Sequence, residues 1–305
     1  MIDFVGKKSW FFRVSGIIIV VGIISLAIFG LRPGVDFVGG TSMTLQFSPS
    51  GSVEQSQLRQ EIADLGYGKA SIRYAEPDFI VHLKGIVSAE EGKKLAQELG
   101  ENLGCAVKMS NPYSASPTVG AETARSAGIA VVIAAVAMLI YIVWAFRRMP
   151  KPFRWGTCAI IALIHDVFII VGIFSILGWL AGVEVDALFI TGLLAVVGYS
   201  INNTVVIFDR IRENVSRHIN PDFAVTVNSS IVETLGRSLN TALTTLFVTL
   251  ALFLFGGATI HYFVLVLLLG VNIGTYSSLC ISSQLLVVWE KGEWGTLLPF
   301  AKKTA

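Results

Sequence analysis

Six long apolar stretches dominate the pattern of hydrophobic and polar positions along the chain. A helix of about 20 apolar residues is long enough to cross the hydrocarbon core of a bilayer. The sequence therefore predicts an all-α polytopic membrane protein with six transmembrane helices. The predicted spans are roughly Val14–Gly30, Ala127–Phe146, Trp155–Leu180, Ala187–Phe208, Leu239–Phe255 and Tyr262–Trp289.

The first apolar stretch has a second interpretation, as a secretory signal. Ser25, Leu26 and Ala27 loosely resemble a signal-peptide cleavage site. Five further spans and a regularly patterned segment after the first stretch favour an uncleaved membrane anchor instead.

The segment between the first two spans has the polar character of a soluble domain. It reads as β-α-β-β-α-β, the order of the ferredoxin-like split motif. "TSMTLQF", "KASIRYA", "DFIVHLK" and "CAVKMS" alternate as strands, with a turn predicted at Glu76 and Pro77. The first helix is expected to start from a Ser52 cap. The second is expected to start from a capping box of Ser88 and Glu91.

Lysine and arginine are confined to alternate loops, which predicts the orientation of the chain. They lie before the first span, between spans two and three, between spans four and five, and after span six. The short loops "AGVEVD" and "GGATIH" contain neither residue. Because cytoplasmic loops are enriched in lysine and arginine, we expect both termini to be cytoplasmic.

This orientation divides the chain into four parts. Residues 1–33 are expected to form a cytoplasmic N-terminus and the first helix, and residues 34–123 an extracytoplasmic ferredoxin-like domain. Residues 124–290 are expected to form a five-helix transmembrane bundle, and residues 291–305 a cytoplasmic tail.

Composition agrees with a membrane protein and argues against several classes of function. Apolar residues make up 53% of the chain, and charged residues only 14%, against about 25% in soluble domains. A net charge of +2 without a basic run among aromatics gives no reason to expect nucleic acid. Cys105, Cys158 and Cys280 show no metal-binding or disulfide spacing. Without a catalytic triad, metal set or phosphate loop, we expect neither an enzyme nor a cofactor.

A carboxylate interrupts the third span. Asp166, in "IIALIHDVFIIVG", lies eleven residues into that span, about 16 Å along a helix. A charge near mid-membrane is costly and usually faces a partner group or water. Asp166 is therefore a candidate functional residue, or a carboxylate satisfied by a neighbouring helix. His165 is expected to point elsewhere around the helix.

The fourth span carries two amides and a carboxylate in "VGYSINNTVVIFDRIREN". Asn202 and Asp209 are seven residues apart and share one helical face, whereas Asn203 is rotated by about 100°. Asp209 could equally be a helix-end carboxylate paired with nearby arginines. The two asparagines could be hydrogen-bonding links between helices.

Spans five and six each carry a periodic pattern. Arg237, Thr241, Thr245 and Thr249 recur every four residues, which predicts a polar stripe and a hydrated path along the fifth span. In span six, the sequence from Gly270 to Gly274 is predicted to be a small-residue packing face.

Together these motifs resemble the SecF family, the smaller membrane subunit of the SecD–SecF complex of bacterial protein export. The resemblance rests on "LRPGVDFVGGTSM", "ALIHDV", "VGYSINNTVVIFDRIREN" and "GRSLNTALTTL" and covers essentially the whole chain. It implies a protein of the bacterial cytoplasmic membrane that pairs with SecD in a twelve-span unit. That unit would bind the Sec channel and use an ion gradient, usually of protons, to help pull preproteins outward.

The resemblance also implies which residues couple the ion to export. The family has an Asp in its "GYSxNDT" motif and an Arg before "TxxTT". Arg237 matches the Arg, but Asn203 stands at the position of the Asp. An amide does not titrate. Either SecD carries the essential carboxylate, or Asp166 or Asp209 substitutes, or the ion differs. The candidate ion-coupling residues are Asp166, Asn202, Asn203, Asp209, Arg237, Thr241 and Thr245.

A junction after the first span is a further candidate site. Asp36, Gly39 and Gly40 follow a break at Pro33 and Gly34, and glycines permit backbone angles that other residues resist. They are predicted to form a hinge that transmits motion to the external domain, with an ordinary turn as the alternative. For the whole chain, an ion-independent scaffold subunit and half of a small-molecule or lipid transporter remain as other functions.

Overall fold

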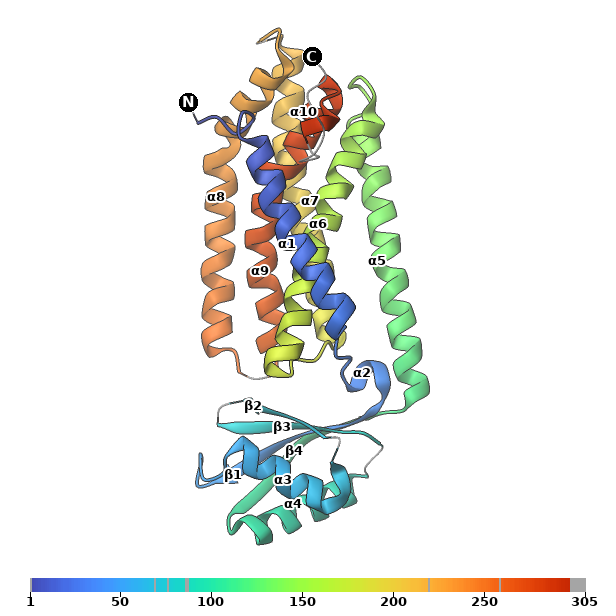
Figure 1. Ribbon diagram of the computed structural model, residues 1–305, viewed down its shortest axis with the longest axis vertical. Helices are drawn as coiled ribbons and strands as arrows, with labels where there is room; N and C mark the ends of the chain where they lie inside the picture. The colour runs from blue at the N-terminus through green and yellow to red at the C-terminus, as the bar shows by residue number, and fades with distance from the viewer. Residues whose placement is uncertain are drawn as a thin grey trace.

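The computed structural model describes residues 2–68, 70–75, 77–85, 88–218, 220–257 and 259–296. A bundle of long helices carries a small α/β head domain at one end, and the N-terminus lies at the opposite end (Figure 1). Within these described residues, six helices are long and apolar enough to cross a membrane by length and composition. The predicted fold class is therefore confirmed.

The six spans form a central layer of three helices with three helices around it. The central spans are α6 (Pro152–Ala181), α7 (Ala187–Ser216) and a sixth span formed by α9 (His261–Ser277), a π-helical turn (Ser278–Ser282) and α10 (Ser283–Lys291). The more exposed spans are α1 (Lys8–Phe29), α5 (Pro117–Ala145) and α8 (Phe223–Phe255). A short 3-10 turn, Trp294–Thr296, follows.

The helix α8 begins 16 residues before the predicted start of its span at Leu239, because its first half is polar but packed against other helices. Thr226, Asn228 and Ser230 are buried there. The Asn214 amide on α7 donates to the Ser230 hydroxyl at 3.0 Å. A count of apolar residues overlooks such a segment, because its burial depends on tertiary packing.

Glycines bring the central helices into backbone contact. A Cβ at Gly270 of α9 would lie 2.0 Å from a methyl carbon of Val196 on α7, and one at Gly274 would lie 3.0 Å from Cβ of Ser200. The predicted packing face in span six is therefore confirmed. On α6, Gly172 approaches α1 just as closely, since its Cβ would lie 2.7 Å from Cα of Gly22.

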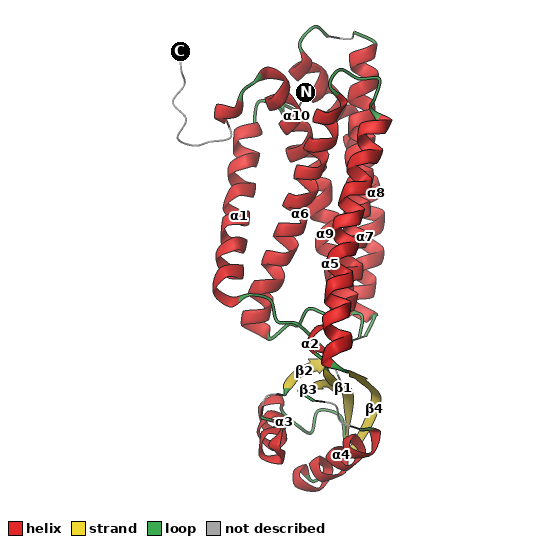
Figure 2. Ribbon diagram, turned by 90° about the vertical axis from the view of Figure 1, so that its right-hand side faces the viewer, coloured by secondary structure: helices red, strands yellow, loops and turns green. Residues whose placement is uncertain are grey.

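The head domain has the predicted ferredoxin-like topology. Its elements are β1 (Gly40–Ser48), α3 (Gln55–Ile62) with a π-helical turn (Ala63–Tyr67), β2 (Ser71–Ala75), β3 (Asp78–Leu83), α4 (Ala89–Leu103) and β4 (Ala106–Ala115). The strands pair antiparallel in the order β2-β3-β1-β4. Both helices cover one face of the sheet, and the other face points toward the bundle (Figure 2).

The two helix starts of the head domain had different outcomes. The capping box is confirmed: the amide of Glu91 donates to the Ser88 hydroxyl at 3.2 Å, and the amide of Ser88 donates to the Glu91 carboxylate at 2.8 Å. The Ser52 cap is wrong. Helix α3 begins at Gln55 after Glu54, because Val53 is buried in the head core and the chain turns into a helix only after it. Glu76 of the predicted turn lies outside the described residues.

The head domain contacts the loop between α6 and α7. The amide of Gly34 donates to the Val185 carbonyl, and the amide of Val185 to the Arg32 carbonyl, both at 2.7 Å. From the sheet, His82 on β3 contacts the Glu184 carboxylate. Arg73 on β2 lies over the ring of Tyr262, 4.6 Å from its centroid.

Candidate functional site

Asp166 lies at the centre of a polar cluster inside the bundle, where α6, α7 and the sixth span meet. Its side chain is 2% exposed. One carboxylate oxygen accepts hydrogen bonds from the hydroxyls of Ser200 at 2.5 Å and Ser277 at 2.7 Å, and the other contacts Nδ1 of His165 at 2.9 Å. The carboxylate is thus removed from lipid and met by three polar groups, as the cost of a membrane charge requires.

His165 belongs to this cluster, contrary to the expectation that it points elsewhere around α6. Both side chains turn toward the interior of the bundle, so that neighbours in sequence reach each other. Nε2 of His165 has no hydrogen-bond partner among the described residues. The ring of Tyr276 lies near it, with the two centroids 6.3 Å apart.

A second set of polar contacts joins α7 to the sixth span beside Asp166. The Asn203 amide donates to the Thr275 hydroxyl at 3.2 Å, and the hydroxyls of Thr204 and Ser278 lie 2.9 Å apart. Asn203 is only 5% exposed. The π-helical turn that begins at Ser278 belongs to the same region, and such turns occur frequently at functional sites.

Sequence reasoning missed most of the partners of Asp166 and Asn203. Serine and threonine are common in membrane helices, so Ser200, Thr275 and Ser277 carried no distinguishing signal. The run "SSLCISSQ" in span six was the available hint, because four serines in eight residues are unusual within an apolar stretch.

Asn202 and Asp209 lie on the outer face of α7, away from the Asp166 cluster. Both are exposed, as their shared helical face predicts. The Asp209 side chain is 57% exposed and pairs with Arg212 at 2.5 Å. The alternative interpretation of Asp209, a helix-end carboxylate paired with a nearby arginine, is therefore the one that the geometry fits.

The stripe on α8 is exposed at one end and buried at the other. Arg237 and Thr241 are exposed, Thr245 is half-buried and Thr249 is buried. Four-residue spacing advances about 40° beyond a full turn at each step, so the stripe rotates toward the interior. Each threonine hydroxyl donates to the carbonyl four residues earlier, at 2.9 to 3.0 Å. Arg237 forms no ion pair with any described residue.

The candidate residues therefore divide into two groups rather than one. Asp166 and Asn203 lie inside the bundle, whereas Asn202, Arg237 and Thr241 lie on its surface. Thr245 is intermediate in exposure, and Asp209 is an exposed residue in the last turns of α7.

The junction residues Asp36, Gly39 and Gly40 lie where the head domain, α5 and α7 meet. The Asp36 carboxylate accepts from the amide of Ala187 at 2.9 Å, at the start of α7. Gly39 and Gly40 have φ of 77° and 132°, which favour glycine. The hinge remains a prediction.

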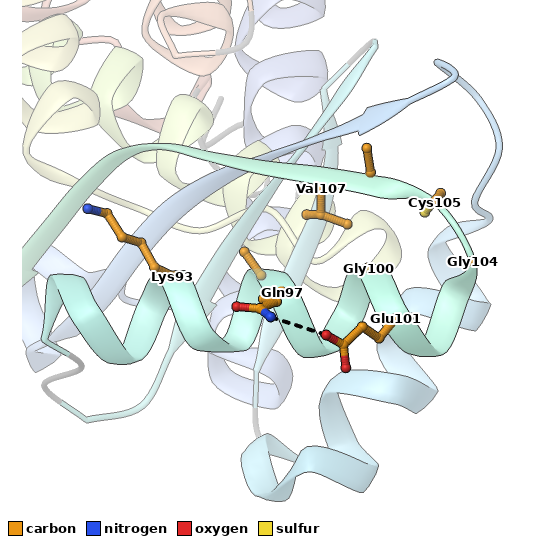
Figure 3. A pocket seen from close by; sticks show the side chains of 9 residues that line it. Lys93, Gln97, Gly100, Glu101, Gly104, Cys105 and Val107 are labelled. Atoms are coloured by element: carbon orange, nitrogen blue, oxygen red, sulfur yellow. Dashed lines mark hydrogen bonds between the residues drawn. The ribbon is translucent and has the colours of Figure 1, made fainter.

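A surface hollow of about 550 Å³ lies between α4 and β4 of the head domain (Figure 3). Lys93, Gln97 and Glu101 line it along α4, and Gln97 donates to Glu101 at 3.2 Å. Its floor consists of small and apolar residues around Val107. Within the described ranges, no group of three His, Cys, Asp or Glu side chains could hold a metal ion.

Comparisons with known proteins agree on one family. Residues 95–292 match the family model for the C-terminal part of the protein export membrane proteins SecD and SecF, and residues 24–50 match that for the SecD/SecF GG motif. The chain is 41% identical to the protein translocase subunit SecF of Anaerolinea thermophila and 42% identical to that of Thermobaculum terrenum. In both comparisons, the alignment covers 96% of each chain.

A solved structure extends this similarity to the fold. The crystal structure of SecDF from Thermus thermophilus, a translocon-associated membrane protein, matches 95% of the chain with a TM-score of 0.83 and 33% identity. The chain spans 39% of the length of that SecDF chain.

Proposed function

This chain belongs to the SecF family of protein translocase subunits, and we propose that it pairs with a SecD subunit and uses a transmembrane ion gradient to promote preprotein export. The gradient is most simply one of protons. The unit would sit in the cytoplasmic membrane of a bacterium beside the Sec channel.

Pairing with SecD is supported by the polar surface that α7 and α8 expose. Asn202, Arg237 and Thr241 are exposed on spans that a bilayer would surround, together with Asn240 and Thr244 of α8. An arginine facing the bilayer centre costs about 2.5–3.5 kcal/mol on insertion scales. A partner helix with polar side chains would remove this cost. The SecDF chain of known structure is more than twice as long as this chain, so it has room for a second half that supplies such helices.

Ion coupling is supported by the surroundings of Asp166. A buried carboxylate on a membrane helix usually serves a function. The oxygens of the Asp166 carboxylate make three polar contacts, with Ser200, Ser277 and His165. Asp209 is exposed and already paired with Arg212. Of the two carboxylates that could replace the family's Asp at Asn203, we therefore propose Asp166 as the ion-carrying one. Arg237 and the polar surface around it would line the path shared with SecD.

The observation that carries the proposed pairing is the exposed polar surface, and photocrosslinking tests it. A photoreactive amino acid at Asn202 or Thr241 should crosslink to SecD in native membranes. The matched control is Ile133 on α5, an apolar residue that is 62% exposed and should meet lipid. Crosslinks to SecD at Ile133 but at neither polar position would contradict the proposed interface.

The proposed orientation places the head domain outside the cytoplasm. Arg147, Arg148 and Lys151 lie in the loop between α5 and α6, at the end of the bundle opposite the head domain, which supports this orientation. In a cysteine-free background, single cysteines at Ser56 and Lys151 should react with an impermeant reagent from opposite sides of the membrane. Reaction from one side would overturn the orientation.

An ion-independent scaffold that holds SecD to the channel is the second candidate. It is favoured by Asn203, which does not titrate and whose amide is used in a contact between α7 and α9. An ionophore distinguishes the two functions, because collapse of the gradient should stop the contribution of a motor and leave that of a scaffold.

A further inference from the structure

We propose that the cleft between α3 of the head domain and the outer end of α6 binds the phosphate-bearing headgroup of an anionic phospholipid. The cleft has a volume of about 600 Å³. Its lining brings together two arginines, Arg32 and Arg59, and two residues at the end of a membrane span, Trp179 and Leu180.

Both arginines are available to a ligand. Neither forms an ion pair with any described residue. The side chain of Arg32 lies along the end of α6, where two glycines leave room for it: a Cβ at Gly178 would lie 3.7 Å from Cγ of Arg32, and one at Gly182 would lie 3.6 Å from Nη1. A guanidinium group held in this way offers the planar fork that binds phosphate oxygens in pairs.

Among the described residues that line the cleft, the one acidic side chain, Glu184, is already engaged. Glu184 contacts His82 through its carboxylate, and Ser71 also donates a hydrogen bond to it. The described lining of the cleft therefore presents two arginines outside any ion pair and one carboxylate that is already hydrogen-bonded. Its chemistry fits an anion and disfavours a cation or a neutral zwitterion.

The cleft lies at the depth where lipid headgroups are found. Trp179 stacks on Phe29 with centroids 4.6 Å apart, and these two residues lie at the ends of α6 and α1. Tryptophan is enriched at this level of membrane proteins. Trp179 is 53% exposed and Leu180 is 64% exposed, so both are free to contact lipid.

An apolar surface for acyl chains continues from the cleft toward the other end of the bundle. On α1, exposed side chains include Ile17, Val21, Ile24 and Ile28. A molecule with an anionic head and hydrocarbon tails meets both surfaces at once, which inorganic phosphate cannot do. The ligand is therefore a phospholipid of the leaflet on the side of the head domain.

The test is lipid binding to the full chain purified together with its membrane partners. Native mass spectrometry would count phosphatidylglycerol and phosphatidylcholine retained by the wild type, by an Arg32→Gln/Arg59→Gln variant and by an Arg125→Gln control. Arg125 is exposed near the start of α5 and forms no ion pair with a described residue. A thermal-shift titration would add short-chain phosphatidylglycerol or inorganic phosphate.

We expect the double variant to lose at least tenfold in affinity for phosphatidylglycerol, and the Arg125→Gln control to bind as the wild type does. Phosphatidylcholine and inorganic phosphate should bind at least tenfold more weakly. Equal loss in the control, equal binding of phosphatidylcholine, or phosphate binding as tight as that of phosphatidylglycerol would each overturn the proposal. Export need not change in any of these outcomes, so this test is independent of the proposed function.

Discussion

Polar side chains of the bundle have their hydrogen-bonding groups satisfied in two ways, either by other helices or by their own backbone. Asp166 is buried with three polar contacts to its oxygens, whereas Thr241 satisfies its own hydroxyl on the backbone of α8. The first arrangement fixes a charge-bearing group between helices. The second arrangement lowers the free-energy cost of exposing a polar residue to lipid. It also leaves the outer surface of that residue free to contact a partner.

At Asn203, we expect the two obvious substitutions to differ. Asn203→Leu removes the donor to Thr275 from a buried position and should lower the free energy of unfolding by about 0.5–2 kcal/mol. Asn203→Asp replaces the donor by an acceptor, which the Thr275 hydroxyl can meet by turning its proton away from the Val271 carbonyl, and should be tolerated in export assays. Unfolding of the purified variants in detergent would measure the first effect. Equal stability of Asn203→Leu and wild type would contradict it.

Some of the site could be predicted from single residues and some could not. Asp166 stands out because a carboxylate in an apolar run is rare. Its contact with His165 could not be predicted, because it depends on which face of α6 becomes the interior. The helical period correctly separated Asn203 from Asn202 and Asp209. It could not tell which of the two faces would be buried, and so which residues would join the Asp166 cluster.

Between elements, one contact of the head domain with the bundle is electrostatic, that of His82 with Glu184. Burial alone would raise the pKa of Glu184, but the hydrogen bond and charge of His82, the hydrogen bond of Ser71 and the charge of Arg73 outweigh it, so the pKa is lowered from 4.5. Other charged or titratable groups nearby are Asp36, Asp186 and His261. Burial, followed by the neighbouring Asp36 carboxylate, raises the pKa of Asp186 from 3.8.

The lowered pKa of Glu184 gives docking of the head domain a pH dependence. A carboxylate with a lowered pKa stabilises the docked state fully above its ordinary pKa of 4.5, and the stabilisation is lost as the pH falls through the lowered value. Spin labels at Ser56 and Thr259 should therefore give a narrow distance distribution at pH 7 that broadens below about pH 4.5.

Two variants control this pH experiment. Glu184→Gln should broaden the distribution already at pH 7. Glu90→Gln, on the exposed start of α4, should behave as the wild type does. A narrow distribution in Glu184→Gln at pH 7 would show that the contact between Glu184 and His82 does not hold the domain.

The junction glycines, Gly39 and Gly40, are predicted to allow the head domain to move relative to the bundle. A Cβ at Gly39 would lie 2.6 Å from the nitrogen of Pro117, and one at Gly40 would lie 2.4 Å from the Leu83 carbonyl oxygen. Valine at either position should impair export severalfold while membrane insertion and copurification with SecD persist. Strained backbone of this kind costs about 1–3 kcal/mol.

The control for the junction is Gly51→Val. Gly51 also has a positive φ, 78°, but a Cβ there meets nothing within 4 Å. The Gly51→Val substitution therefore imposes a similar backbone strain at a position away from the junction. If Gly51→Val impairs export as much as Gly39→Val does, strain in the head domain explains both effects and the hinge is not needed.

Elements were predictable where their signals are local. The capping box at Ser88 was correct because its hydrogen bonds close within four residues. The predicted start of α3 was wrong because Val53 is buried in the head core, a tertiary effect, and the helix begins only after the extended Glu54. The contact between His82 and Glu184 joins residues 102 positions apart, and no local pattern indicates such a pairing.

For the whole molecule, the buried cluster around Asp166 and the exposed polar surface of α7 and α8 imply a division of roles. The surface would be completed by SecD, and the cluster would take up the coupling ion between central helices of this chain. The head domain contacts the outer ends of the same helices through Glu184 and Asp36. A change in packing at the cluster could therefore reach the head domain through α6 and α7.

Gradient-stimulated export in inverted membrane vesicles tests this account most directly. With SecD and the Sec channel present, Asp166→Asn should abolish the stimulation of preprotein translocation by an imposed ion gradient and leave ATP-driven translocation intact. Asp209→Asn, as the matched control, should keep the stimulation, and both variants should insert and copurify with SecD. If Asp166→Asn and Arg237→Leu both leave gradient-stimulated export unchanged, the ion path does not run through this chain, and the chain acts as a scaffold.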